Sequence, residues 1–256
     1  VYADEVVPDR ILSETYVPVD ENDWNLKLEY ADEADAVPVM TLDGLAYSGW
    51  SGITFGSDTE TSALEIVITG EDSIIDKGVN NDGVGGSYYY AHGALTFKTT
   101  GTVTITSVDD AKLTLKGDNQ KNLSGDAFEA IVKAKGDVVF ENANVMIEGS
   151  TNAYIADAAI QAVGDVTVSG GKMELKSDGN MGKLIVCKDL VFENHANLVV
   201  KGDNSARGGY APLIVADNMT IDASNISIGV RMQALGVAPT ITNCGPTMAS
   251  ASTEEG

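Results

Sequence analysis

Tyrosine residues recur in this sequence shortly before one kind of predicted strand. They are Tyr88, Tyr89, Tyr90, Tyr154 and Tyr210. Aromatic rings can stack on the flat faces of sugar rings, and their polar edges can form hydrogen bonds. If successive repeats of the chain lie in register, these rings line one edge of the molecule and form a candidate carbohydrate-binding platform. The alternative is that the rings pack over a corner of the hydrophobic core.

Aspartates recur in the same connecting segments, beside glycine and asparagine. The four candidates are Asp126, Asp157, Asp178 and Asp203, the last two within KSDGN and KGDNSAR. Carboxylate and carbonyl oxygens are the ligands that Ca²⁺ prefers in proteins, so these residues are candidate calcium ligands. We expect that the protein can bind calcium but requires no cofactor. The alternative is that the aspartate and asparagine side chains close turns onto their own backbone.

Catalytic groups are harder to find. A polysaccharide lyase needs a lysine or arginine base beside groups that neutralise a carboxylate. The only arginines are Arg10, Arg207 and Arg231, far apart in the sequence, and no basic cluster is expected. A glycosidase needs two carboxylates about 5 to 10 Å apart, whereas the outward-facing acids Glu65 and Glu174 fall on different repeats. We therefore expect a protein that is not an enzyme.

The composition limits the classes of partner. The 256 residues include 16 lysines and arginines against 38 aspartates and glutamates, which leaves a formal net charge of −22. This charge repels phosphates at long range, so nucleic acid is not an expected partner. No apolar run approaches the ~20 residues that cross a bilayer, so we expect no membrane span. The start, VYADEVVPDR, lacks signal-peptide features, so any signal peptide has been removed or never existed. We expect a secreted or cell-surface monomer.

The elements that must position these residues come from an internal repeat. Six segments share one pattern: IVITGEDSIIDKG from 66, LTFKTTGTVTITS from 95, VVFENANVMIEG from 138, VTVSGGKMELKS from 166, LVFENHANLVVKG from 190 and MTIDASNISIGV from 219. Each segment alternates apolar and polar residues, turns on glycine, asparagine, aspartate or serine, and alternates again. Alternation with period two is typical of a half-buried strand, so each segment predicts a strand, a turn and a strand.

The apolar residues of the repeats align in four predicted inward columns. The first column is Ile66, Leu95, Val138, Val166, Leu190 and Met219, and the second is Ile68, Phe97, Phe140, Val168, Phe192 and Ile221. Beyond the turn, the third column is Ile74, Val103, Val145, Met173, Leu198 and Ile226, and the fourth is Ile105, Ile147, Leu175, Val200 and Ile228, with Asp76 in the first repeat. A third strand is predicted before the later repeats, at 130–134, 159–163, 184–187 and 213–216.

The spacing of the repeats favours an all-β, right-handed parallel β-helix, a solenoid with three short strands per rung and about six to seven rungs. Successive repeats begin 29, 43, 28, 24 and 29 residues apart, which exceeds a hairpin and leaves no room for crossover helices. An antiparallel sandwich is the structural rival, because alternation alone does not distinguish the two pairings. The 43-residue interval contains AKLTLKGDN, which is either an extra rung or a strand of its neighbour, so the register of 107–135 stays open.

We expect one structural domain in three parts. These are an N-terminal cap with first strands at 1–61, the β-helix at 62–230, and a C-terminal cap with a disordered tail at 231–256. Cys187 and Cys244 are either two unrelated thiols or one disulfide.

The segments ALEIVITGEDSII, GALTFKTTGTVTI and AIQAVGDVTVSGGKMELKS resemble those of the carbohydrate-binding domain proteins of secreted bacterial surfaces. The resemblance covers about residues 62 to 230 and implies a right-handed parallel β-helix akin to pectate lyases. It also implies binding of cellulose-like or acidic, pectin-like polysaccharide, in some members with calcium and without clear catalysis. The frequent Asp-Gly-Ile rung of that family is replaced here by DAAI and GKLI, so no ligand residue is carried over.

We expect a protein that binds polysaccharide without catalysis, and calcium is a candidate bridge between the protein and its ligand. Two other functions stay open. One is a surface adhesin or structural protein that recognises a protein partner, which a large exposed apolar face would favour. The other is a degenerate polysaccharide lyase or hydrolase.

Overall fold

A computed structural model describes residues 24–30, 37–49, 52–57, 59–76, 79–80, 89–90, 93–117, 128–149, 155–177, 184–202, 214–227, 232–235 and 238–244. The regular structure of these residues consists of strands and includes no helix, so the predicted all-β class is confirmed. The strands form a 14-stranded sheet, a seven-stranded sheet and a separate two-stranded sheet.

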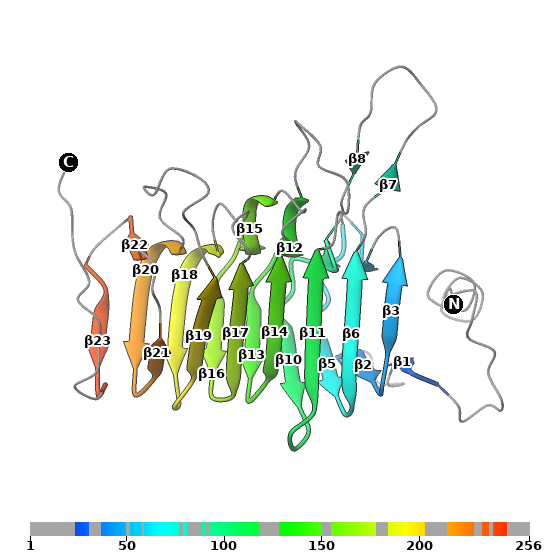
Figure 1. The fold of residues 1–256 in the computed structure, drawn as a ribbon, viewed down its shortest axis with the longest axis horizontal. Helices are drawn as coiled ribbons and strands as arrows, with labels where there is room; N and C mark the ends of the chain where they lie inside the picture. Colours follow the sequence, from blue (N-terminus) through cyan, green and yellow to red (C-terminus); the bar gives the residue numbers. More distant parts are fainter. Residues whose placement is uncertain are drawn as a thin grey trace.

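The two large sheets consist of three parallel ladders, which the chain visits in the same order on each pass (Figure 1). Ladder 1 contains β2 (Val39–Leu42), β5 (Leu64–Ile68), β10 (Val103–Ser107), β13 (Val138–Glu141), β16 (Val166–Ser169), β18 (Ile185–Glu193), β20 (Ile214–Asp222) and β23 (Thr240–Thr242). Ladder 2 contains β3 (Ala46–Gly49), β6 (Glu71–Asp76), β11 (Lys112–Gly117), β14 (Asn144–Gly149), β17 (Lys172–Ser177), β19 (Asn197–Gly202) and β21 (Asn225–Ser227).

Ladder 3 contains β4 (Ile53–Phe55), β9 (Leu95–Phe97), β12 (Phe128–Ala134), β15 (Ile155–Ala162), the first halves of β18 and β20, and β22 (Met232–Ala234). The second halves of β18 and β20 belong to ladder 1. We call one pass through the three ladders a rung. β1 (Leu26–Glu29) pairs antiparallel with β2, and parallel pairing starts at Val39, within the segment 1–61 predicted as cap and first strands.

For the last four repeats, the strand pairs of the described residues confirm the predicted columns. For the first two repeats, the predicted columns are wrong. Leu95 pairs with Val132 in ladder 3, whereas Val103 is the residue that pairs with Val138 in ladder 1. In the first repeat, Ile66 pairs with Ile105, which pairs with Phe140. Ile66 therefore belongs to the second column and not to the first, a shift of two residues. A shift of two residues keeps every side chain on its own face of the strand, so alternation alone does not detect it.

The same correction places the described residues of the open interval 107–135, which are 107–117 and 128–135. AKLTLKGDN contains β11, which pairs with β6 and β14 and is therefore the ladder-2 strand of the rung that β10 begins. In the first repeat, Ile74 then pairs with Leu115, which in turn pairs with Ile147 of the fourth column, and Asp76 pairs with Gly117 instead of standing in that column.

All three ladders contribute apolar columns to one buried cluster. Ladder 1 supplies Met40, Ile66, Ile105, Phe140, Val168, Phe192 and Ile221, ladder 2 supplies Leu113, Val145, Met173 and Leu198, and ladder 3 supplies Leu95, Val132, Ile160, Ile185 and Ile214. Within the ladder-1 column, the smaller Val168 lies between the two bulky side chains of Phe140 and Phe192. The core therefore runs along the whole stack, and the ladders present their other faces outward.

The turn from ladder 1 to ladder 2 explains why asparagine and glycine recur there. Asn142, Gly170, Asn194 and Ala223 all have positive φ values, between 46° and 70°. Glycine tolerates this left-handed conformation freely, and asparagine tolerates it better than most residues. The backbone N–H of Asn142 and that of Gly170 each donate to a carbonyl of the next rung, at 2.8 and 3.0 Å. The turns therefore stack as regularly as the strands that they join.

The two cysteines are free thiols. Cys187 lies in ladder 3, where it pairs with Ala216, and burial raises the pKa of its thiol to about 12. A thiol with such a pKa stays protonated at neutral pH, so Cys187 acts as a small apolar core residue.

Candidate functional site

Apart from Asp157, the residues that the sequence suggested as a site lie in the sequence between a ladder-2 strand and the following ladder-3 strand. Tyr89 and Tyr90 form β8 (Tyr89–Tyr90), which pairs antiparallel with β7 (Val79–Asn80) in the two-stranded sheet. Asp157 lies in β15, for which the structure describes only the backbone at that position. Outside the described residues lie Tyr88, Tyr154, Tyr210, Asp126, Asp178 and Asp203. The tyrosine platform and the calcium ligands stay predictions.

The described residues bring a different set of polar side chains together on the outer face of ladder 2. We call this surface the ladder-2 face and define it by nine residues of three neighbouring strands. They are Lys112, Thr114 and Lys116 of β11, Asn144, Met146 and Glu148 of β14, and Lys172, Glu174 and Lys176 of β17. In each strand these residues alternate with buried ones, so all nine point away from the core.

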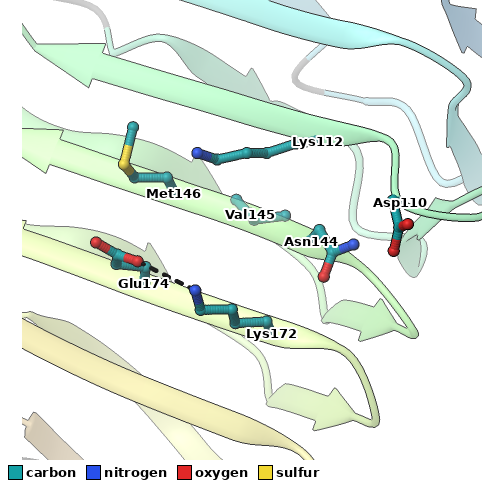
Figure 2. Close-up of a pocket in the computed structure, with 7 residues that line it drawn as sticks. All are labelled: Asp110, Lys112, Asn144, Val145, Met146, Lys172 and Glu174. Carbon is teal, nitrogen blue, oxygen red and sulfur yellow. Dashed lines mark ion pairs between the residues drawn. The ribbon is translucent and has the colours of Figure 1, made fainter.

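A shallow pocket of about 230 Å³ lies at one end of this face (Figure 2). Its lining residues are Asp110, Lys112, Asn144, Val145, Met146, Lys172 and Glu174. Asp110 belongs to the turn before β11, and the others come from β11, β14 and β17. The pocket therefore crosses three strands and offers ammonium groups, an amide, two carboxylates and one thioether side by side.

Ion pairs organise the charges of the ladder-2 face. The Glu148 carboxylate lies 3.2 Å from Lys176 Nζ and 3.9 Å from Lys116 Nζ, and Lys172 Nζ lies 3.4 Å from the Glu174 carboxylate. Both glutamate side chains are only 16% exposed, whereas that of Lys172 is 51% exposed. Among the described residues Lys112 makes no ion pair. A ligand above β14 and β17 would therefore meet lysine ammonium groups before it meets the Glu148 and Glu174 carboxylates, whereas Asp110, at the edge of the pocket, is exposed.

The ladder-2 face was not predicted from the sequence, because the expectation of no basic cluster rested mainly on the positions of the arginines. The signal was present in two strands, KLTLKG and KMELKS, which place lysines at their first and fifth positions. Residues four apart in a strand point to the same side. Only the corrected register shows that Lys112 and Lys172 lie two strands apart on one surface, with Asn144 between them.

A second unusual group is a carboxylate inside the core. Asp72 of β6 is 2% exposed and pairs with Leu113, so it stands in an otherwise apolar column. Its Oδ1 accepts a hydrogen bond from the Leu45 backbone N–H at 2.5 Å, but Oδ2 has no partner among the described residues. Burial raises the pKa of Asp72 above its ordinary value of 3.8; hydrogen bonds from Leu45 and Gly70 oppose this, and Asp43 and Glu71 add to it.

Replacing Asp72 with asparagine is expected to stabilise the protein near neutral pH, on the order of 1 kcal/mol, because an amide carries no charge to be desolvated. The folded state raises the pKa of Asp72, so its stabilising contribution is complete at pH values below 3.8 and is lost as the pH rises through the folded pKa. Urea unfolding of both proteins at several pH values measures this difference. A stability difference that does not grow between pH 3.5 and pH 7 would contradict the expectation.

The described residues include no helix of the length and apolar character needed to cross a membrane. They also contain no cluster of three or more histidine, cysteine, aspartate or glutamate side chains arranged to hold a metal ion. No protein-family model, curated protein or solved structure matches this chain.

Proposed function

We propose that this chain is a secreted or cell-surface protein that binds polysaccharide without cleaving it, and that its fold is a right-handed parallel β-helix with three strands per rung. The observation that carries the proposal is the pocket on the ladder-2 face. There Lys112 and Lys172 flank Asn144 and Met146 on three adjacent strands.

The spacing of the face suits a sugar chain that crosses the strands. Neighbouring strands are separated by about 4.8 Å, and one unit of an extended sugar chain has a similar length. Lysine and asparagine can donate hydrogen bonds to hydroxyl or carboxylate oxygens, and glutamate can accept them from hydroxyl groups. Met146 offers an adaptable apolar surface for the C–H face of a sugar ring. Each strand thus contacts one sugar unit.

Calcium and the loop tyrosines belong to the proposal as a second contribution. Asp126, Asp157, Asp178 and Asp203 are the candidate ligands of an ion that would bridge this acidic protein to an acidic polymer. The tyrosines would stack on sugar units beyond the ladder-2 face. Binding measured with calcium and with a chelator separates this contribution from that of the lysines.

The test is a double substitution, Lys112→Ala with Lys172→Ala. Two exposed charge-assisted contacts worth roughly 1 kcal/mol each predict about a 30-fold loss of affinity for the polysaccharides that the unmodified protein retains. Affinity electrophoresis against cellulose-like and pectin-like polymers, followed by calorimetry with soluble oligosaccharides, measures this loss.

The matched control is Lys27→Ala with Lys188→Ala, which removes the same charge from exposed lysines outside the ladder-2 face. The control is expected to keep affinity within about twofold, because surface charges far from the ligand contribute little at physiological salt. Retention of no polymer by the unmodified protein, with or without calcium, would refute the proposed function. Equal losses in both double variants would refute the location of the site.

A further inference from the structure

The three strands of the ladder-2 face differ in charge in an alternating manner. The outer two strands carry two lysines each, Lys112 and Lys116 on β11 and Lys172 and Lys176 on β17. The middle strand, β14, presents only Asn144, Met146 and Glu148. A cation-free strand therefore lies between two strands that each offer two ammonium groups (Figure 2 shows one lysine of each).

The register makes this alternation a spatial period. Asn144 pairs with Lys172, and Glu148 pairs with both Lys116 and Lys176. Cations in the same column are consequently two strand spacings apart, about 10 Å. Over β11, β14 and β17, an extended sugar chain with one unit per strand places its first and third units over lysine-bearing strands; the period ends at β19, where Lys201 pairs with Lys176.

The middle strand favours an uncharged sugar. A carboxylate on a unit above the Met146–Glu148 part of β14 would approach Glu148, and the lysines beside that glutamate are already engaged, Lys176 at 3.2 Å. Like charges at short distance discriminate strongly against a ligand. A neutral unit avoids this repulsion, because its hydroxyl groups can donate to Glu148 and its apolar face can rest on Met146.

The outer strands favour acidic sugars. Lys112 is the described lysine of this face that has no ion pair, and Lys172 is half exposed beside Glu174. A carboxylate above β11 would gain a charge-assisted hydrogen bond from Lys112 that a neutral sugar cannot match.

We infer that the ladder-2 face selects a polysaccharide in which acidic and neutral sugars alternate, in preference to a homopolymer of acidic sugars or an entirely neutral chain. This inference rests on the proposed function, since it specifies the ligand of the same site. The selection comes from the strand between the lysines as much as from the lysines themselves.

Calorimetric titration of the whole protein with three soluble oligosaccharides of equal length tests the inference. The first alternates glucuronate with N-acetylglucosamine, the second is oligogalacturonate, and the third is a cello-oligosaccharide. Titration at about 0.15 M salt screens the repulsion between an acidic ligand and the acidic protein, because the Debye length is then about 8 Å. The alternating ligand is expected to bind at least about fivefold more tightly than either of the others.

The variant Asn144→Lys places a cation on the middle strand and should reduce this selectivity. We expect its affinity for oligogalacturonate to rise about fivefold relative to the unmodified protein, with a smaller gain for the alternating ligand. The matched control is Thr220→Lys, which adds the same charge to the outward side of β20 in ladder 1. The control should leave the order of the three affinities unchanged.

The outcomes separate the two proposals. If none of the three ligands binds, the proposed function fails and this inference fails with it. If oligogalacturonate or the cello-oligosaccharide binds as tightly as the alternating ligand, the inference is overturned while the proposed function stands. The inference is also overturned if Asn144→Lys and Thr220→Lys have the same effect, since net charge alone would then explain the gain.

Discussion

Replacing Phe192 with alanine is expected to lower the free energy of unfolding by about 3 to 5 kcal/mol. Phe192 is fully buried in ladder 1 and is one of the two largest fully buried side chains among the described residues. It stacks between Val168 and Ile221 of the neighbouring rungs. The cost combines the lost burial of a large apolar side chain with the cavity that a column between rigid ladders cannot close. Urea unfolding followed by circular dichroism measures it.

The adjacent residue provides a control within the same strand. Val191 points outward and is half-buried, so Val191→Ala is expected to cost less than about 1 kcal/mol. The slope of the unfolding transition should also be compared, because stacked repeats can unfold in parts when one interface is weakened. Similar losses for Phe192→Ala and Val191→Ala would show that Phe192 does not face the core.

Replacing Gly136 with alanine is expected to cost about 3 kcal/mol, because the new methyl group has no space. A Cβ atom at this position would lie 2.5 Å from the Gly101 carbonyl oxygen and 2.6 Å from that of Thr100. Both are backbone atoms of the preceding rung, so no side-chain rotation relieves the overlap. The two rungs would have to separate at the corner between ladder 3 and ladder 1, which would weaken the adjoining hydrogen bond from the Val103 N–H to the Asp137 carbonyl, 2.9 Å long.

Gly44 is the matched control for this second substitution. It has a positive φ of 66°, but a Cβ atom there would meet only the Asn25 side chain, at 3.7 Å. Gly44→Ala is therefore expected to cost about 1 kcal/mol, which is the strain of a left-handed backbone without overpacking. Thermal and urea unfolding of both variants distinguish the two causes. If Gly136→Ala proved no more destabilising than Gly44→Ala, the close approach of the rungs at Gly136 would be wrong.

The stacked architecture and the proposed binding surface depend on each other. The close approach at Gly136 and the large core residues at Phe140 and Phe192 hold successive rungs in register. That register brings Lys112 of one rung and Lys172 of a rung two strands away onto one flat surface. Variants that loosen the stack are therefore expected to weaken ligand binding even where they touch no ligand.

Much of the fold could be predicted from local alternation. In the last four repeats, the apolar residues at every second position and the asparagine or glycine turns located the strands and their inward faces, as at Val138, Phe140 and Asn142. The reason is physical: a strand has a period of two, and a left-handed turn selects a small set of residues. These constraints act within about ten residues, so they are visible in the sequence itself.

The first two repeats and the candidate site were decided by tertiary structure. LTF at 95–97 and TVTITS at 102–107 alternate equally well, and only pairing with β12 and β13 assigns them to ladder 3 and ladder 1. The site depends on the same non-local pairing, because Lys112 and Lys172 are 60 positions apart in the sequence and meet on one face only through β14. Alternation specifies which side of a strand a residue occupies, whereas the neighbours of that strand depend on how whole rungs pack against one another.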